Sequence, residues 1–369
     1  MKPVYQPDPI GAESTANSLR GGQRSSRRTW LASVGASLAL AGACSKPTGL
    51  KLQGSGASFP APLYTRWFQE YSAATAGVTV DYQAKGSGAG IKDFINRTVD
   101  FAASDAAMTE AELAQVDGGV ILLPLTAGKI VLAYNLPGAP PELRLSRDVY
   151  TKIFRGEITR WDDPAIVACN DAVSLPAVDI TVVVRSDSSG TTYVFSRHLS
   201  EISPPWKETF GTEKSINWAD SNRFVKGPKN DGVTALIKQT PGAIGYVEYG
   251  FASQTGQPMA TLENRAGNYV KPTLESGQAA LAGTALPADL VGWLPDPAAE
   301  QAYPIVTYTW LLCYRSYPDP RQAAALKGVI RYCLTRGQAI SGDLGYIPLP
   351  IEVAESVAAV AETIRSGSE

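Results

Sequence analysis

Histidine is almost absent from this chain, since His198 is the only one among 369 residues. A Ser-His-Asp triad would have to use this one residue, and a histidine-rich metal site cannot be built. His198 follows Tyr193 and Phe195 on a helix-like segment, so we expect an ordinary helix residue. No uninterrupted apolar run reaches the ~18–20 residues of a membrane span. The formal net charge is only −2, which does not favour nucleic acid as a partner.

The N-terminal 43 residues have the pattern of an export signal. Arg27 and Arg28 form a twin-arginine pattern before Trp30, and a mildly apolar stretch rich in Ala, Gly and Leu runs to residue 43. This order favours a twin-arginine signal peptide, with a general secretory signal as the alternative. Either signal predicts that the protein acts outside the cytoplasm, in the periplasm or cell envelope.

Cys44 follows a run of small residues, Ala41-Gly42-Ala43, that can be interpreted in two ways. The run satisfies the A-x-A rule for signal cleavage. Together with Cys44 it also resembles a bacterial lipobox, in which the cysteine is lipidated. A cysteine placed directly after the small residues favours lipidation, with residues 44–49 as a short tether and the membrane reached only through this anchor.

Three further cysteines, Cys169, Cys313 and Cys333, leave two alternatives open. Cys313 and Cys333 lie near each other in sequence, and a disulfide can form in an oxidising compartment. An odd number leaves at least one thiol free, and buried inert cysteines fit equally well.

The order of predicted elements favours an open α/β sheet. Strand-like runs at 50–56, 78–82 and 99–103 alternate with helical spacing that begins at Pro60 and near Ile91. Residues 119–136, interrupted by Pro124 and Gly128, predict two strands, and 179–184 and 303–310 are strand-like as well. In open α/β sheets, ligands bind beyond the carboxyl ends of the strands. We predict a two-lobed clamshell with two crossovers, lobe I being 50–127 and 305–369 and lobe II 128–304.

Three short turns offer hydroxyls and free backbone amides where helices should begin. They occupy residues 56–60, 86–90 and 185–191. A helix start leaves its first N–H groups unpaired and carries partial positive charge, so it is a natural anion site. Three such turns predict a cage for a multivalent oxyanion.

Arg185 stands at the end of the predicted strand 179–184, just before the third turn. Its planar fork can hold two oxygens of a tetrahedral anion, and Asp187 is placed to hold the guanidinium. The alternative is a plain salt bridge at a strand end, but the helix start that follows favours anion binding.

Asp105 narrows the choice of anion, because a carboxylate repels a fully deprotonated one. Hydrogen phosphate can donate a proton to it, whereas sulfate at neutral pH has none to donate. An unpaired buried acceptor would cost about 1–3 kcal/mol, so Asp105 would select against sulfate. The alternative, about equally supported by the pattern, is an N-cap for a helix at 108–116.

The chain resembles the periplasmic phosphate-binding proteins of bacterial phosphate ABC transporters. Segments 56–64, 86–91, 99–105, 156–164, 185–191 and 241–249 carry the resemblance, which spans nearly all of the chain after residue 50. It implies phosphate contacts at eight positions: Ser58, Phe59, Ser87, Asp105, Arg185, Ser189, Gly190 and Thr191. Asp187, Gly86 and Gly88 would support them. Ser58 replaces a common threonine, Ser188 replaces a common glycine, and Ala106-Ala107 follow Asp105 where a proline is often seen, with no loss of a donor or acceptor.

We therefore expect a monomeric, non-catalytic protein that captures inorganic phosphate between its lobes. It would hand phosphate to the permease and ATPase subunits of an ABC transporter, without a cofactor or metal. A secreted phosphatase is the first rival, but neither G-x-S-x-G nor G-x-x-x-x-G-K-[ST] occurs. A carrier for sulfate or molybdate and a phosphate-sensing module are the others.

Overall fold

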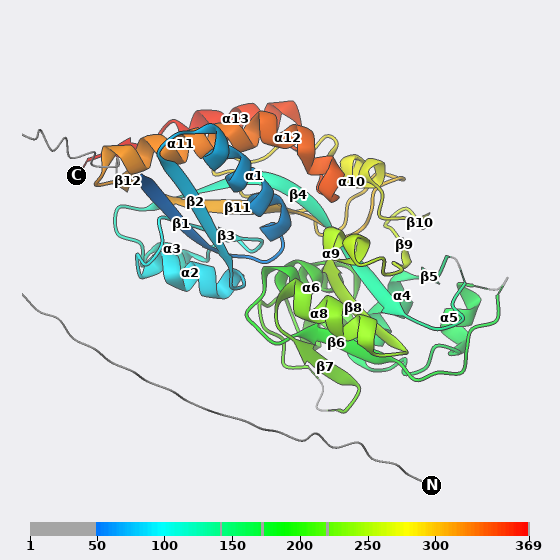
Figure 1. The fold of residues 1–369 in the computed structure, drawn as a ribbon. Helices are drawn as coiled ribbons and strands as arrows, with labels where there is room; N and C mark the ends of the chain where they lie inside the picture. Colours follow the sequence, from blue (N-terminus) through cyan, green and yellow to red (C-terminus); the bar gives the residue numbers. More distant parts are fainter. Residues whose placement is uncertain (1–48, 141, 171–172, 219–220, 368–369) are drawn as a thin grey trace, which may run out of the picture. The chain divides into compact units, whose positions relative to one another are not determined.

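The computed structural model describes residues 49–367 except 141, 171–172 and 219–220. The predicted export signal, Cys44 and most of the tether lie outside the described residues. Within the described part, one eight-stranded sheet has the strand order β2-β1-β3-β11-β4-β8-β6-β7. Strand β4 lies between two sets of strands, and helices flank both sets (Figure 1).

The first set of strands forms the sheet of one lobe, which we call lobe I. Strand β1 pairs in parallel with β2 and β3, and β11 runs antiparallel to both β3 and β4. Because β1 to β2 and β2 to β3 cross the sheet in opposite directions, right-handed connections place α1 and α2 on opposite faces. The elements are β1 (Leu50–Gly56), α1 (Ala61–Ala74), β2 (Val78–Ala84), α2 (Ser87–Ile95), β3 (Phe101–Ser104), α3 (Glu110–Leu113), β4 (Val120–Asn135), β11 (Val306–Tyr314), β12 (Ser316–Tyr317), α11 (Pro320–Leu334), α12 (Arg336–Ser341), a 3₁₀ helix (Gly342–Leu344), α13 (Ile351–Ala361) and β13 (Arg365–Ser366).

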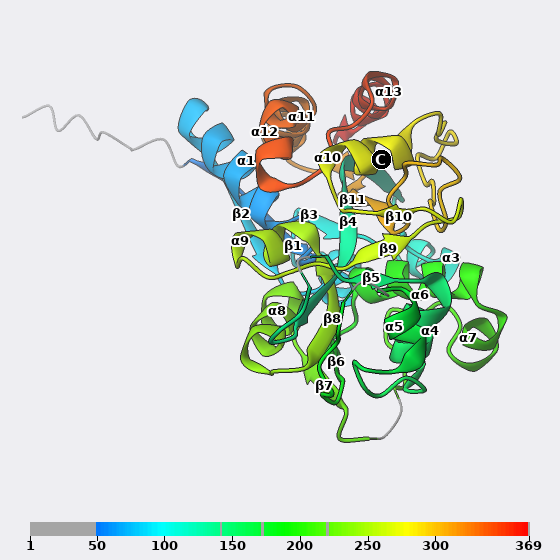
Figure 2. The same cartoon turned by 90° about the vertical axis from the view of Figure 1, so that its right-hand side faces the viewer.

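The second set of strands forms the sheet of lobe II. Strand β6 pairs in parallel with β7 and β8, and β8 runs antiparallel to the far end of β4. Helices α6 and α8 lie on opposite sides of these strands (Figure 2). The elements are β5 (Arg144–Leu145), α4 (Arg147–Arg155), α5 (Pro164–Ala168), β6 (Thr181–Arg185), α6 (Gly190–Ile202), α7 (Pro204–Thr209), β7 (Phe224–Gly227), α8 (Lys229–Gln239), β8 (Ala243–Glu248), α9 (Tyr249–Gln254), β9 (Thr261–Glu263), β10 (Tyr269–Val270) and α10 (Leu274–Leu281).

The predicted two-lobed α/β architecture is confirmed, but one strand prediction is wrong. Residues Val120–Asn135 form the single continuous strand β4, not two strands joined by a crossing. Pro124 is tolerated because β11 is the only strand beside this half of β4, and its register shifts there between Thr309 and Trp310. The other edge of this half has one bridge, between Ala127 and Ile347. The other half pairs with β8, so β4 runs from one lobe into the other (Figure 1). The chain returns through the segment that enters β11.

Helix α1 shows how apolar spacing builds the core. Its buried side chains recur at helical spacing, and the helix packs against β2 and α11. They are Leu63, Tyr64, Trp67, Phe68 and Tyr71. The Trp67 indole N–H donates to the Gly337 carbonyl at 2.8 Å, which links the first helix to α12. Helices from near the beginning and near the end of the described chain therefore pack together in lobe I.

Two open alternatives are decided by the structure. Cys169, Cys313 and Cys333 are all free thiols, and Cys313 and Cys333 are buried, so the disulfide is absent from the described residues. Asp105 does not cap a helix at 108–116. The helix there is only Glu110–Leu113, and a reciprocal capping box between Thr109 and Glu112 starts it.

Candidate functional site

The candidate site lies where parallel strands of both lobes end. Strands β1, β2 and β3 end at Gly56, Ala84 and Ser104, and β6 and β7 end at Arg185 and Gly227. The three predicted turns follow β1, β2 and β6 directly, and Asp105 follows β3. The site therefore obeys the general rule that ligands bind at the carboxyl ends of strands in α/β sheets.

The first turn presents the Ser58 hydroxyl and leads into α1. Ser58 is buried, and its Oγ accepts hydrogen bonds from the backbone N and the Nδ2 of Asn230, at 3.2 and 3.0 Å. The Phe59 ring faces the core instead, in an edge contact with Tyr346. The Tyr346 hydroxyl also donates to the Phe59 carbonyl at 2.6 Å, so Tyr346 contacts both the ring and the carbonyl of Phe59.

The second turn starts helix α2 at a glycine. Gly86 is the residue before the helix and has a φ of 95°, a conformation that favours glycine. Ser87, the first helical residue, is buried, and its Oγ accepts from the backbone N of Asp105 at 3.4 Å. Gly88 donates its backbone N–H to the carbonyl of Ser188 at 3.1 Å, which joins this turn to lobe II.

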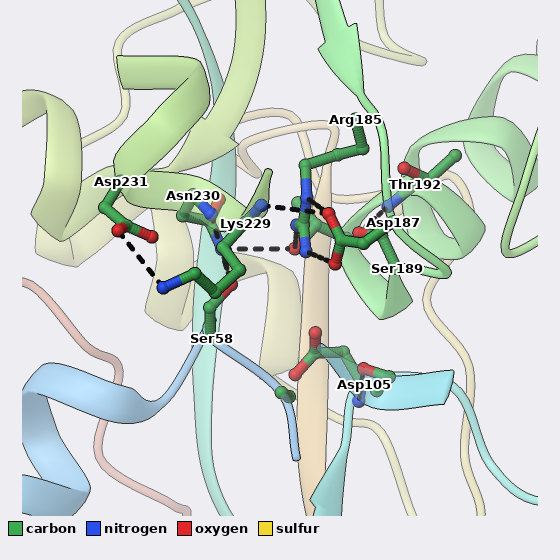
Figure 3. Close-up of polar contacts among 12 residues, drawn as sticks. Ser58, Asp105, Arg185, Asp187, Ser189, Thr192, Lys229, Asn230 and Asp231 are labelled. Carbon is green, nitrogen blue, oxygen red and sulfur yellow. Dashed lines mark hydrogen bonds and ion pairs between the residues drawn. The ribbon is translucent and has the colours of Figure 1, made fainter. Parts of the chain in front are cut away.

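The third turn is organised by an ion pair and a helix cap. Arg185 donates from Nε and Nη2 to the two carboxylate oxygens of Asp187, at 2.8 and 2.6 Å (Figure 3). Burial alone would raise the pKa of Asp187, but this pairing outweighs it and lowers the pKa. The Ser189 hydroxyl caps α6 by accepting from the Thr192 N–H at 3.0 Å. The N–H groups of Gly190 and Thr191 have no partner inside the helix.

Asp105 is a buried carboxylate at the junction of the lobes. It is 1% exposed, and its Oδ1 accepts from the Thr309 hydroxyl at 2.8 Å. Desolvation raises its pKa to about 7, although the Thr309 hydroxyl, the Arg185 charge and the Ser87 hydroxyl act in the opposite direction. The group therefore changes charge near neutral pH, while it faces the start of α6.

The structure brings the predicted residues of both lobes together. A Cβ atom added to Gly190 would clash with Ser87 Oγ and lie 2.7 Å from Asp105 Oδ2. A Cβ on Gly86 would clash with Asp187, and one on Gly88 with the Ser188 side chain. A side chain at any of these three positions would therefore force neighbouring groups at the junction of the lobes to shift. The side chain of Ser188, the unusual residue of the third turn, lies against Gly88, where an added Cβ atom would meet it.

Two important residues of this region are not among those predicted from the sequence. Asn230, at the start of α8, is fully buried and contacts both Ser58 and Thr191. Thr309 reaches Asp105 from β11. The strand–turn–helix order at 224–239 could have indicated Asn230, but this turn has no serine or threonine. No local pattern marks Thr309, since it lies within a strand.

The chemistry available at this site is binding of an anion. Hydroxyls, backbone N–H groups and one guanidinium converge, together with one carboxylate acceptor. His198 lies elsewhere on α6, where its ring bonds Tyr150 Oη and the Pro295 carbonyl, so it is a buried residue of the helix predicted there. Among the described residues, no group of three or more His, Cys, Asp or Glu side chains could hold a metal ion. The same residues contain no helix long and apolar enough to span a membrane.

Comparison with known proteins shows the structural class of this chain. A family model described as a PBP superfamily domain matches residues 41–336. The solved structure of a high affinity periplasmic phosphate-binding protein bound with phosphate superposes with a TM-score of 0.70 at 23% identity, covering 84% of this chain and 93% of that one. A phosphate-binding protein from Stenotrophomonas maltophilia gives 0.67 at 23% identity, covering 84% and 94%. The chain has the periplasmic-binding-protein fold.

Curated relatives define the family more closely. The phosphate-binding protein PstS of Pasteurella multocida is 37% identical over 322 residues, which cover 86% of this chain and 92% of that protein. PstS of Haemophilus influenzae is 36% identical, covering 83% and 91%. PstS of the archaeon Methanocaldococcus jannaschii is 34% identical, covering 84% and 85%. The chain belongs to the PstS family of phosphate-binding proteins.

Proposed function

We propose that this protein captures inorganic phosphate between its two lobes and delivers it to an ABC-type phosphate permease. The observation that carries the proposal is the buried Asp105 carboxylate, set against the start of α6 within a shell of donors. A shell of donors alone would suit any oxyanion. A carboxylate inside that shell suits an anion that still holds a proton.

The proposed phosphate ligands come from both lobes. Hydroxyl and backbone donors would hold three oxygens, Arg185 would add charge, and Asp105 would accept the phosphate proton. The ligands are Ser58, Phe59, Ser87, Asp105, Arg185, Ser189, Gly190 and Thr191, with Asp187, Gly86 and Gly88 in support. Phe59 would contribute its backbone N–H, because its ring is buried against Tyr346.

Closure would bring these ligands together around the anion. We place the lobe boundaries at 127/128 and 304/305, where β4 and the segment before β11 pass between the lobes. Rotation about these two connections is the hinge motion typical of such proteins. The protein would act as a monomer in the periplasm or cell envelope, exported by its N-terminal signal and anchored through lipidated Cys44. Mass spectrometry of the mature protein tests the anchor.

Calorimetric titration with phosphate, sulfate and arsenate tests the proposed function. We expect tight phosphate binding, much weaker sulfate binding, and a gain in relative sulfate affinity for Asp105→Asn. Tight binding of sulfate by the unaltered protein would refute the proposed selectivity. Assays of phosphate-ester hydrolysis, with and without divalent metal, should show no activity if the protein is only a carrier. Delivery is tested by phosphate uptake in cells that lack the gene. The unaltered protein should restore uptake there, whereas Arg185→Met, which we expect to bind phosphate poorly, should not.

A further inference from the structure

Asn230 connects the two lobes at the candidate site. Its Nδ2 donates to Ser58 Oγ of lobe I at 3.0 Å and to Thr191 Oγ1 of lobe II at 3.4 Å (Figure 3 shows Asn230 beside Ser58). The preceding residue, Lys229, has a φ of 57°, and its backbone N–H donates to Asp187 Oδ1 at 2.9 Å. A non-glycine residue in this conformation is strained, so the start of α8 is held in place by its contacts.

The orientation of the Asn230 amide is determined by a group that can only donate. The backbone N–H of Glu248 donates to Asn230 Oδ1 at 3.0 Å. Exchanging the amide oxygen and nitrogen would bring two donors together there, so Nδ2 must face Ser58 and Thr191. With two donated bonds and one accepted bond, the fully buried amide is satisfied by these three partners.

This orientation fixes what the two hydroxyls can do. A hydroxyl has two lone pairs and one hydrogen. Ser58 Oγ accepts from both the backbone N and the Nδ2 of Asn230, so both lone pairs are used. Thr191 Oγ1 accepts from Arg185 Nη1 at 3.3 Å and from Asn230 Nδ2. Each hydroxyl retains only its hydrogen for a further partner, and that partner must be an acceptor.

We propose that Asn230 is a positioning residue that forces the Ser58 and Thr191 hydroxyls to act as donors to a bound oxyanion. This inference rests on the proposed function and names a residue that would act through two ligands without touching phosphate itself. It explains why a side-chain amide, and not a carboxylate of the same shape, stands at this buried position. In the closed arrangement the two hydroxyls are thereby left as donors that suit an anion.

Replacing the amide with a carboxylate is the sharpest test. In Asn230→Asp the two hydroxyls would donate to the new carboxylate and turn away from phosphate, and a negative charge would be added. We expect phosphate affinity to fall by about 100-fold, against about 10-fold for Asn230→Ala. Asn264→Asp is the matched control. Asn264 is equally buried and bonded on both sides, by the carbonyls of Glu300 and Ala302 and the N–H groups of Ala266 and Asn268, and contacts no proposed ligand.

A double-mutant cycle separates positioning from a merely structural role and does not need Asn230→Asp to fold. Asn230→Ala is measured in the unaltered protein and in the Ser58→Ala/Thr191→Val background, where no hydroxyls remain to be oriented. We expect the 10-fold loss to shrink to less than about twofold. An equal loss in both backgrounds, or equal affinities of Asn230→Asp and Asn230→Ala, would overturn the inference. Failure of the unaltered protein to bind phosphate would instead refute the proposed function.

Discussion

Gly190 of lobe II and Asp105 of lobe I approach each other so closely that a Cβ atom on Gly190 would lie 2.7 Å from Asp105 Oδ2. The same Cβ would clash with Ser87 Oγ. A methyl group at position 190 would therefore push the start of α6 away from the start of α2. The close approach of the two lobes at this point therefore depends on the small size of Gly190.

Gly190→Ala should abolish tight phosphate binding without unfolding the protein. The added methyl group would block the approach of the two lobes, and we expect affinity to fall by about 100-fold. Isothermal titration measures the loss. Gly342→Ala is the control, because a Cβ there meets only Leu274 Cδ2 at 3.6 Å. Comparable losses in both variants would show that closure is not what the Gly190 contact governs.

The pKa of Asp105 predicts that sulfate binding depends on pH. Its pKa of about 7 leaves the carboxyl protonated at pH 5 and able to donate to sulfate, whereas at pH 8 it is mostly ionised and repels sulfate. We expect sulfate affinity to be about 10-fold higher at pH 5 than at pH 8. Competition of sulfate with labelled phosphate measures it. Asp105→Asn should bind sulfate equally at both pH values, and a flat profile in the unaltered protein would contradict the prediction.

The turns around Ser58, Ser87 and Ser189 could be predicted because their chemistry is local. Each joins a strand to a helix within a few residues, and hydroxyls and glycines have clear physical roles at helix starts. Asn230 could not be predicted in the same way. Its partner Ser58 is 172 residues away in the chain, and the turn between β7 and α8 has the strand–helix order but no serine or threonine to mark it. Only the fold brings the ends of β1 and β7 together.

Strand β4 and Asp105 show two further limits of local patterns. Proline and glycine often end strands, but Pro124 lies where one edge of β4 has no neighbouring strand, and this removes the penalty for proline. For Asp105, capping and ligand binding were equally consistent with the sequence. The capping box of Thr109 and Glu112, a stronger local signal four residues later, excludes the first interpretation.

An ion pair between the lobes is expected to favour the closed arrangement. Lys214 Nζ lies 2.6 Å from Glu112 Oε1, and both side chains are partly buried. The Lys214 carbonyl also accepts from the N–H of Ser189, so the pair is coupled to the start of α6. Burial would raise the pKa of Glu112, but the bonds from Lys214 and Thr109 lower it overall. The pair therefore stabilises the closed arrangement.

Lys214→Met should weaken phosphate binding by about threefold, or ~0.7 kcal/mol, and reduce its dependence on salt. Titrations at low and high ionic strength measure both effects. Lys152→Met is the matched control, because Lys152 pairs with Asp148 on α4, wholly within lobe II and exposed to solvent. If Lys214→Met and Lys152→Met bind alike, the pair has no part in closure.

His198 predicts how stability depends on pH, and its uniqueness in the chain makes the test clean. Nδ1 lies 2.6 Å from the Pro295 carbonyl and must donate, so Nε2 accepts from Tyr150 Oη, and the neutral ring fits. Burial lowers its pKa from 6.5 to about 4. The unfolded chain thus takes up a proton first, and the stability present above pH 6.5 is lost as pH falls toward 4. From pH 7 to pH 5 this loss is about 2 kcal/mol.

His198→Gln should remove this loss of stability, as measured by urea unfolding at the two pH values. Carboxyls with raised pKa values, Asp105 and Glu248, act in the opposite direction but cancel in the difference between the two proteins. Parallel pH profiles would show that His198 titrates normally in the folded protein.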